Sequence, residues 1–279
     1  MNVLQALVLG IVQGLTEFIP VSSSGHLVLT PFFLGWKEPS LAFVVAVHVG
    51  TLGAVLWYFR ERVGAVLTTL TGWRNAAEGD RRLVRFLVVA TIPAVIAGIA
   101  FEAAVGKTFE RPVPVLLLLA VTGYLLLTTE SLTEHRETDP VEGQVSLRDQ
   151  DAMVFADAAT IGVAQAVAIL PGISRSGATI TAGMRRGLTR RSAARFSFLM
   201  SIPVIFGAVL VQIPDISNQA GRSKADALSF IVGIVASAVS GFFSIRWFLG
   251  IIERRGLRPF GVYCFFVFVA GLLTALARG

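Results

Sequence analysis

Two short segments of the sequence gather polar side chains within otherwise apolar surroundings. The first contains Gln13 and Glu17 and continues as Pro20-Val-Ser-Ser-Ser-Gly-His26. Gln13 and Glu17 are four residues apart, so they share one face of a helix. A carboxylate at the centre of a bilayer costs at least about 2.5–3.5 kcal/mol, which predicts a function for Glu17. The alternative is that Glu17 lies at an interface and is merely solvated.

The hydroxyl and imidazole groups of the first segment could supply a nucleophile and an acid or base. Ser22, Ser23 and Ser24 lie just ahead of His26. A serine at such a position is often only a helix N-cap, and a lone histidine beside an apolar run is often a hydrogen-bonded packing residue. The closeness of His26 to three hydroxyls and to Glu17 favours catalysis.

The second segment has the sequence PGISRSGAT. Its Pro-Gly break precedes Ser174, a predicted helix cap, then Arg175 and the further hydroxyls of Ser176 and Thr179. The free N–H groups and positive dipole end of a helix, with a guanidinium beside them, suit a phosphate or diphosphate. The alternative is that Arg175 is buried only to pair with Glu17.

The composition indicates the elements that hold these segments. Of 279 residues, 54% are hydrophobic and 15% are charged, against about a quarter charged in soluble domains. The apolar residues form long runs, so we predict an all-α polytopic membrane protein. The net charge of +6 is interpreted as topology and not as nucleic-acid binding. The single cysteine, Cys264, excludes a disulfide framework.

The apolar runs predict six full transmembrane helices, at about 41–59, 85–101, 113–130, 196–213, 229–249 and 260–277. Arginine-rich stretches at 60–85, 185–195 and 254–258 are predicted to be cytoplasmic, with 102–112 and 214–227 as outer loops. Parity then requires residues 3–33 and 155–188 each to begin and end on one side. We predict two re-entrant helical hairpins that enter from opposite faces.

The two hairpins also resemble each other. Five residues of the first, Gly10, Gln13, Ser22, Ser24 and Gly25, recur 152 positions later as Gly162, Gln165, Ser174, Ser176 and Gly177. This pattern predicts an inverted-topology repeat within a single membrane domain, 1–279. The first repeat is 1–130, the cytoplasmic connecting loop 131–153 and the second repeat 154–279. Because broken helices at membrane depth must be buried, the two tips are expected to meet inside the protein.

The segments QGLTEFIPVSSSGH and PGISRSGAT resemble the two signature regions of the undecaprenyl pyrophosphate phosphatase family, also called bacitracin-resistance proteins. The resemblance covers essentially the whole chain. It implies removal of the terminal phosphate of a polyprenyl diphosphate at the outer side of the plasma membrane, usually with Mg²⁺ or Ca²⁺. Such a phosphatase recycles the lipid carrier for cell-envelope glycan synthesis and gives bacitracin resistance.

This chain departs from the family pattern at one position of the first motif. The family usually has Glu or Gln, three residues, then Glu; here Gln13 leaves one carboxylate in place of two, which puts metal affinity in question. The place of His48 commonly holds Gln or His, so His48 is interpreted as unremarkable.

Carried over residue by residue, the resemblance implies a site of nine residues. The catalytic candidates are Glu17, Ser23, His26, Ser174 and Arg175, the substrate-binding candidates are Gln13, Ser22, Ser176 and Thr179, and Glu17 is also the metal candidate. Arg175 would hold the diphosphate, and Glu17 would bind the cation or activate a hydroxyl or water. Ser23 or Ser174 could be the nucleophile, with His26 as its base or as the leaving-group acid. Direct attack by water stays open.

A transporter is the competing interpretation, since inverted repeats with broken helices are a transporter architecture. Such a protein could flip a polyprenyl phosphate without hydrolysing it. The concentration of hydroxyls, His26 and Arg175 exceeds what anion binding requires and favours the enzyme. The predicted partners are the lipid diphosphate and membrane lipids, with no nucleic acid; a homodimer is compatible with the sequence.

Overall fold

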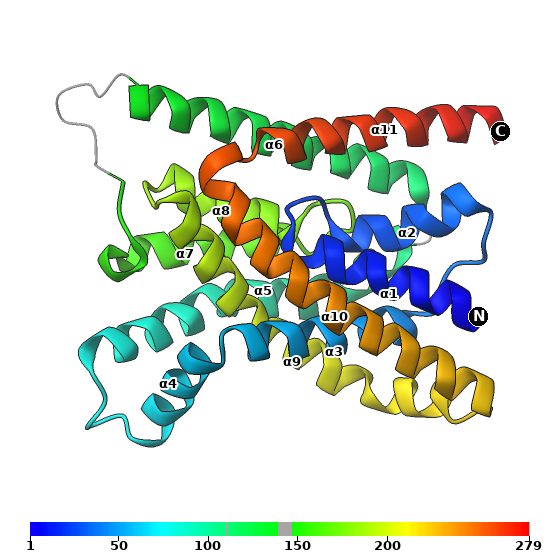
Figure 1. The fold of residues 1–279 in the computed structure, drawn as a ribbon, viewed down its shortest axis with the longest axis horizontal. Coiled ribbons are helices and arrows are strands. Elements are labelled where there is room, and N and C mark those ends of the chain that lie inside the picture. The colour runs from blue at the N-terminus through cyan, green and yellow to red at the C-terminus, as the bar shows by residue number, and fades with distance from the viewer. Residues whose placement is uncertain (110, 139–146, 279) are drawn as a thin grey trace.

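The structure, a computed structural model, describes residues 1–109, 111–138 and 147–278. Within these ranges every regular element is a helix (Figure 1). The elements are α1 (Val3–Phe18), α2 (Ser23–Leu34), α3 (Leu41–Tyr58), α4 (Arg60–Thr71), α5 (Glu78–Phe109), α6 (Pro112–Thr138), the 3-10 helix η1 (Gln150–Ala152), α7 (Phe155–Val167), α8 (Arg175–Arg185), α9 (Arg190–Ala220), α10 (Lys224–Arg255) and α11 (Arg258–Arg278).

Six of the described helices are long and apolar enough to cross a membrane. They are α3, the Glu78–Phe101 part of α5, the Pro112–Thr133 part of α6, α9, α10 and α11. Each contains or coincides with one of the predicted crossings, so the predicted all-helical architecture with six long apolar helices is confirmed over the described residues. The 31 residues of α9 and the 32 of α10 exceed the roughly 20 that a bilayer needs, so these helices tilt or project beyond it.

Several predicted loops are helical instead. Residues 60–85 include the helix α4. Glu61 lies in its first turn, where a negative charge interacts favourably with the positive end of the helix dipole. Residues 214–227 are mostly the end of α9 and the start of α10. Charged and polar side chains at a helix end resemble a loop in sequence, although the backbone hydrogen bonds continue. Of the connecting loop 131–153, residues 139–146 lie outside the described residues.

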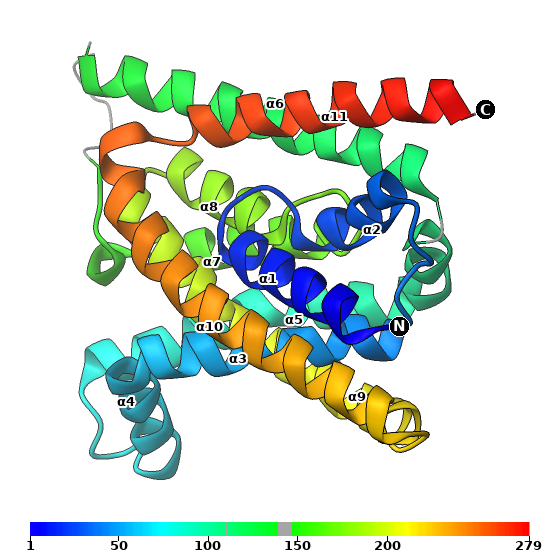
Figure 2. The ribbon, with the colours of Figure 1, turned by 45° about the vertical axis from the view of Figure 1, so that its right-hand side comes forward.

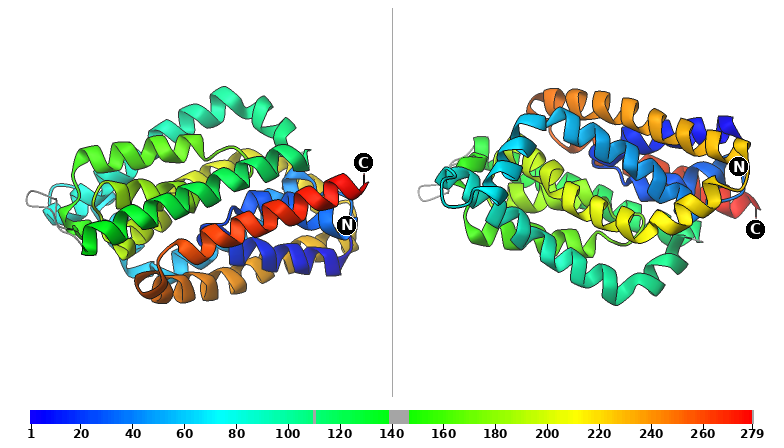
Figure 3. Two further views of the ribbon diagram at one scale, coloured as in Figure 1. Left: turned by 90° about the horizontal axis from the view of Figure 1, so that it is seen from above. Right: turned by 90° about the horizontal axis from the view of Figure 1, so that it is seen from below.

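Four short helices, α1, α2, α7 and α8, lie among the long ones (Figure 1). In Figures 1 and 2, α1 runs from the end that holds both termini toward the centre and α2 returns, while α7 and α8 do the same from the opposite end. Their two connecting loops lie side by side at the centre. Figure 3 shows α6 and α11 together on one side, with α3, α9 and α10 on the other.

Small residues let α10 approach α1 and α3 closely. A Cβ added at Gly14 would lie 2.0 Å from Ser240 Oγ, and one at Gly50 would lie 2.0 Å from Ser237 Oγ. Without side chains at these positions, van der Waals contact between backbones replaces the hydrophobic effect, which is weak between helices in lipid. This packing holds α1, and with it Glu17, against the long helices.

The first break, between α1 and α2, follows from its sequence. Ile19 is extended, with φ −70° and ψ 136°, as expected for a residue before proline. The next helix begins at Ser23, and the hydroxyl of Ser22 accepts a hydrogen bond from the N–H of Gly25 at 3.2 Å.

The second break, between α7 and α8, also ends in a serine that caps the next helix. Gly172 has φ +103°, which only glycine adopts readily, and Ser174 Oγ caps α8 by accepting from the N–H of Gly177 at 3.0 Å. The tips touch, because the hydroxyl of Ser176 donates to the carbonyl oxygen of Ile19 at 3.3 Å. The expected meeting of the two tips inside the protein is confirmed.

Candidate active site

Glu17 is the centre of the polar cluster where the tips meet. Its Oε1 accepts from Arg175 Nη2 at 2.6 Å, and its Oε2 accepts from Ser23 Oγ at 2.6 Å and Gln13 Nε2 at 2.9 Å. The Nε2 atom of His48 lies 3.5 Å from the same Oε2. The carboxylate is 5% exposed, so these partners replace water around it.

The helix break explains why these groups converge. Gln13 and Glu17 lie on one face of the last turns of α1, and Gln13 donates across the turn. Ser23 is the first residue of α2, so the chain reversal returns its hydroxyl to the carboxylate six positions earlier. A continuous helix would place residues six apart on different faces.

Arg175 supplies the guanidinium from the second tip. It is the first residue of α8, and its Nη1 donates to the carbonyl oxygen of Ser197 in α9 at 3.1 Å. The pairing with Glu17 that the sequence offered as an alternative to phosphate binding is therefore present. The Arg175 side chain is 16% exposed, so the protein does not enclose it completely.

His26 lies apart from the carboxylate. Its Nδ1 is 2.8 Å from the carbonyl oxygen of Ser22, and its Nε2 is 2.8 Å from the hydroxyl oxygen of Tyr263. The hydroxyl of Ser23 is hydrogen-bonded to Glu17 and not to His26. The hydrogen-bond partner of the Ser23 hydroxyl is therefore the carboxylate and not the imidazole.

Ser22 has an uncommon backbone conformation. Its φ is +67° and its ψ 92°, and it is the single non-glycine residue with positive φ in the described ranges. Such conformations cost about 1–3 kcal/mol and cluster at functional sites. The carbonyl of Ser22 accepts from the N–H of His26 at 3.0 Å and faces its Nδ1, so this corner orients the imidazole.

The hydroxyls of the second tip are engaged in structure. Ser174 Oγ caps α8 and lies 3.2 Å from Ser176 Oγ. Thr179 Oγ1 donates to the carbonyl of Arg175 at 2.8 Å and lies 2.7 Å from Ser197 Oγ. All of these side chains except that of Arg175 are buried, and none of their hydrogen bonds reaches Glu17. They shape the tip that presents Arg175.

Two site residues were missed from the sequence, His48 and Tyr263. Each stands in an apolar run, where nothing nearby in the chain indicates a partner. For His48, an ionisable group inside a predicted span was itself a signal. The phenol of Tyr263 gave no comparable signal, because tyrosine is common at membrane interfaces.

The donor set for a divalent cation is small. Among the described residues no group of three or more His, Cys, Asp or Glu is arranged to hold a metal. What the site offers is the Glu17 carboxylate and Gln13 Oε1, a buried amide oxygen with no hydrogen-bond partner. Mg²⁺ commonly binds through one or two carboxylates together with phosphate oxygens. A cation at this site would therefore need most of its ligands from the diphosphate or from water.

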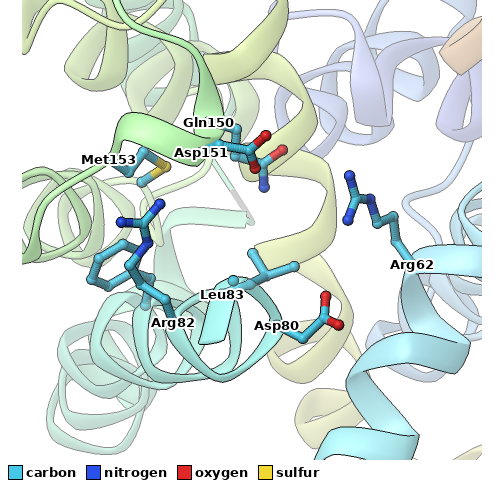
Figure 4. A pocket seen from close by; sticks show the side chains of 9 residues that line it. Arg62, Asp80, Arg82, Leu83, Gln150, Asp151 and Met153 are labelled. Atoms are coloured by element: carbon cyan, nitrogen blue, oxygen red, sulfur yellow. The ribbon is translucent and has the colours of Figure 1, made fainter. Parts of the chain in front are cut away.

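A separate cavity lies between α4, α5 and η1 (Figure 4). Its volume is about 70 Å³, with Arg62 and Arg82 on opposite sides and the carboxylates of Asp80 and Asp151 between them. The charges of these four residues balance, and the space suits a few water molecules. None of its lining residues comes from the two tips, so it is not part of the Glu17 cluster.

Comparisons with known proteins give a consistent result. A family model described as bacitracin resistance protein BacA matches residues 6–270. An undecaprenyl-diphosphatase of Rubrobacter xylanophilus is 44% identical over 99% of this chain and 98% of its own length. Undecaprenyl-diphosphatase 2 of Stutzerimonas stutzeri is 42% identical over 94% of each chain. An undecaprenyl-diphosphatase of Gemmatimonas aurantiaca is 42% identical over the full length of both.

Proposed function

The chain belongs to the bacitracin resistance protein BacA family, and from this premise we propose that it is an undecaprenyl-diphosphatase. It hydrolyses the lipid diphosphate to the monophosphate and inorganic phosphate, and so recycles the lipid carrier. The observation that carries the proposal is that Glu17 accepts hydrogen bonds both from the Ser23 hydroxyl and from the Arg175 guanidinium. Phosphoryl transfer requires such a neutralised and positioned site more than elaborate covalent chemistry.

Arg175 binds the diphosphate in this proposal. A planar guanidinium at the start of α8, next to the positive end of the helix dipole, is suited to phosphate oxygens. The ion pair with Glu17 holds the guanidinium in place before substrate arrives. When the diphosphate binds, Arg175 shares its N–H groups between the carboxylate and the phosphate.

Glu17 activates the nucleophile, and Ser23 is that nucleophile. The 2.6 Å hydrogen bond from Ser23 Oγ to Glu17 Oε2 is the arrangement in which a base takes a hydroxyl proton. The oxygen attacks the terminal phosphorus, the polyprenyl monophosphate leaves, and water then hydrolyses the phosphoserine to release phosphate. Ser174 is less suited, since its hydroxyl caps α8.

A divalent cation, Mg²⁺ or Ca²⁺, would be held by Glu17 and by the unpartnered Oε1 of Gln13. It would neutralise charge on the phosphate oxygens. Gln13 and Ser23 fix the orientation of the carboxylate by donating hydrogen bonds to its Oε2.

We also propose that α1–α2 and α7–α8 are re-entrant hairpins of an inverted repeat in the plasma membrane, with repeat boundaries 1–130 and 154–279. Supporting this, α1 has 16 residues and α7 has 13, below the roughly 20 of a spanning helix. The end that holds α4 and the start of α9 is rich in arginine, which favours the cytoplasm there and an outer opening at the α2 end. Labelling of cysteines introduced at Leu34 and Arg255, in a Cys264→Ser background, should come from opposite sides.

The proposed function is tested by phosphate release from undecaprenyl diphosphate, using purified protein in detergent and in liposomes. We expect release by the unaltered protein and by Glu253→Gln, whose carboxylate is 49% exposed and pairs with Arg191. Glu17→Gln should release almost none. Movement of polyprenyl phosphate across liposomes without phosphate release would support the transporter interpretation instead.

A further inference from the structure

The imidazole of His26 is held between two oxygen atoms that differ in kind. The carbonyl oxygen of Ser22, 2.8 Å from Nδ1, can only accept a hydrogen bond. Nδ1 therefore carries a proton, and in the neutral ring Nε2 is the acceptor. The hydroxyl of Tyr263, 2.8 Å from Nε2, then donates to it. The Ser22 carbonyl thus selects the neutral tautomer with the proton on Nδ1, and the Tyr263 hydroxyl occupies the lone pair of Nε2.

Tyr263 also restrains the plane of the imidazole. The two rings are 9° from parallel, with centroids 5.6 Å apart. His26 itself is 8% exposed, whereas Tyr263 is 41% exposed. The phenol thus stands between the buried imidazole and the surroundings of the protein. It comes from α11, 237 positions away from His26 in the chain, so it joins the last helix to the first tip.

The pair borders the proposed reaction centre. His26 is three residues after Ser23 in α2, and residues three apart lie on the same face of a helix, with Cβ atoms about 5–6 Å apart. The Ser23 hydroxyl faces Glu17, so the imidazole lies one turn away from the nucleophile. At that distance the imidazole can exchange a proton with a different oxygen of the same diphosphate.

We propose that Tyr263 is a positioning residue for His26. Its hydroxyl donates to Nε2 and fixes the rotation of the imidazole beside the lipid-phosphate site, with Nε2 as the basic atom of the ring. This inference rests on the proposed phosphatase function for its catalytic consequence. Its structural part, the hydrogen bond from Tyr263 to Nε2, stands independently of that function.

The kinetic test is a double-mutant cycle of Tyr263→Phe and His26→Ala, with phosphate release as the readout. Tyr263→Phe keeps the ring stack and removes the hydroxyl, so kcat should fall about tenfold while KM stays within about threefold. In the His26→Ala background the same change should have almost no further effect, because its partner is gone. Tyr124→Phe, an exposed tyrosine of α6, is the matched control and should retain full activity.

Two kinetic results would overturn the proposal. The first is a kcat of Tyr263→Phe equal to that of the unaltered protein. The second is a double variant whose fold-loss in kcat equals the product of the two single fold-losses. The second result would mean that Tyr263 acts through packing and independently of the imidazole. Thermal unfolding of each variant in detergent, expected to lie within a few degrees of the unaltered protein, separates a loss of fold from a loss of positioning.

The spectroscopic test needs no substrate. Nitrogen NMR of protein labelled at its three histidines should show the His26 ring, identified by its loss in His26→Gln, with the proton on Nδ1. Tyr263→Phe should leave the proton on Nδ1, where the Ser22 carbonyl holds it, and should shift the Nε2 signal because its hydrogen bond is lost. An unchanged signal would refute the inference even if the enzyme hydrolyses the lipid. If the protein releases no phosphate, the proposed function fails and the spectrum still decides the role of Tyr263.

Discussion

The two interrupted segments share their helix caps and differ in chemistry. At equivalent positions, Ser22 and Ser174 cap the returning helices through the N–H groups of Gly25 and Gly177. Gln13 and Gln165 are both buried with an unpartnered Oε1.

The chemical groups occupy the positions where the segments disagree. The first tip has Glu17, Ser23 and His26 where the second has Ile169, Arg175 and Ala178. Repeated residues thus build the corner, and the residues that we propose for the chemistry are those that are not repeated. One tip supplies the carboxylate, hydroxyl and imidazole, while the other supplies the guanidinium. The following substitutions test this division.

Glu17→Gln should have the largest effect, a loss of phosphate release of about 10⁴-fold, because it removes the proposed base. It also leaves Arg175 without its anionic partner, and removing one member of a buried pair destabilises a protein by about 3–5 kcal/mol. Thermal unfolding must therefore be measured beside activity, with Glu253→Gln as the control. Full activity of Glu17→Gln across the pH range would show that this carboxylate takes no part in the chemistry.

Ser23→Ala should lose about 10³-fold in kcat, within the range seen when a group that acts in the reacting unit is removed. Ser174→Ala, in the second tip, should chiefly lose the helix cap, about 1 kcal/mol of stability. Phosphate release and thermal unfolding of the two variants would be compared directly. Equal losses of activity would contradict the assignment of Ser23 as nucleophile and Ser174 as cap.

Arg175→Lys should lower phosphate release about 10²-fold although the charge is kept, since a planar fork with several donors becomes a point charge. Arg191→Lys is a suitable control, because Arg191 is exposed and pairs only at 3.5 Å with Glu253. Activity within about threefold of the unaltered protein, less than the 1.4 kcal/mol of a tenfold change, would make Arg175 a structural partner of Glu17 and not a substrate ligand.

Gln13→Glu should have the smallest effect on the rate, but its effect should distinguish the two proposed roles of Glu17. If Glu17 binds the cation, a second carboxylate should lower the concentration of Mg²⁺ or Ca²⁺ needed for half-maximal activity. If Glu17 acts only as a base, like-charge repulsion should move the acidic limb of the pH–rate profile upward instead.

Gln165→Glu is the matched change in the second tip, where it should alter stability and not cation dependence. Titration of cation after treatment with a chelator measures both variants. An unchanged cation midpoint together with an unchanged acidic limb in Gln13→Glu would exclude both roles for Glu17.

The spans were predictable because hydropathy over about 20 residues depends on local composition alone. The tips were predictable for a similar reason, since Pro20 and the Pro171-Gly pair interrupt helices locally. The helix α4 was not predictable, because the charged residues Arg60-Glu61-Arg62 at its start are typical of a loop after a membrane span.

The site was predictable only in part. Glu17, Ser23 and Arg175 stood out as polar groups at helix breaks, and the structure brings them together. The link from His26 to Tyr263 depends on how α11 packs near α2. No local pattern in the chain encodes that packing, so it could not be read from the sequence.

The ion pair of Glu17 and Arg175 joins residues 158 positions apart, which has a consequence for biosynthesis. At synthesis rates of about 5–20 residues per second, roughly 8–30 s separate the emergence of the carboxylate from that of its guanidinium partner. During this interval Glu17 has its nearer partners Gln13, Ser23 and His48 but lacks the guanidinium. The first tip therefore reaches its final arrangement only after the second is inserted, and a chain truncated before Arg175 should hold Glu17 less firmly than the full chain does.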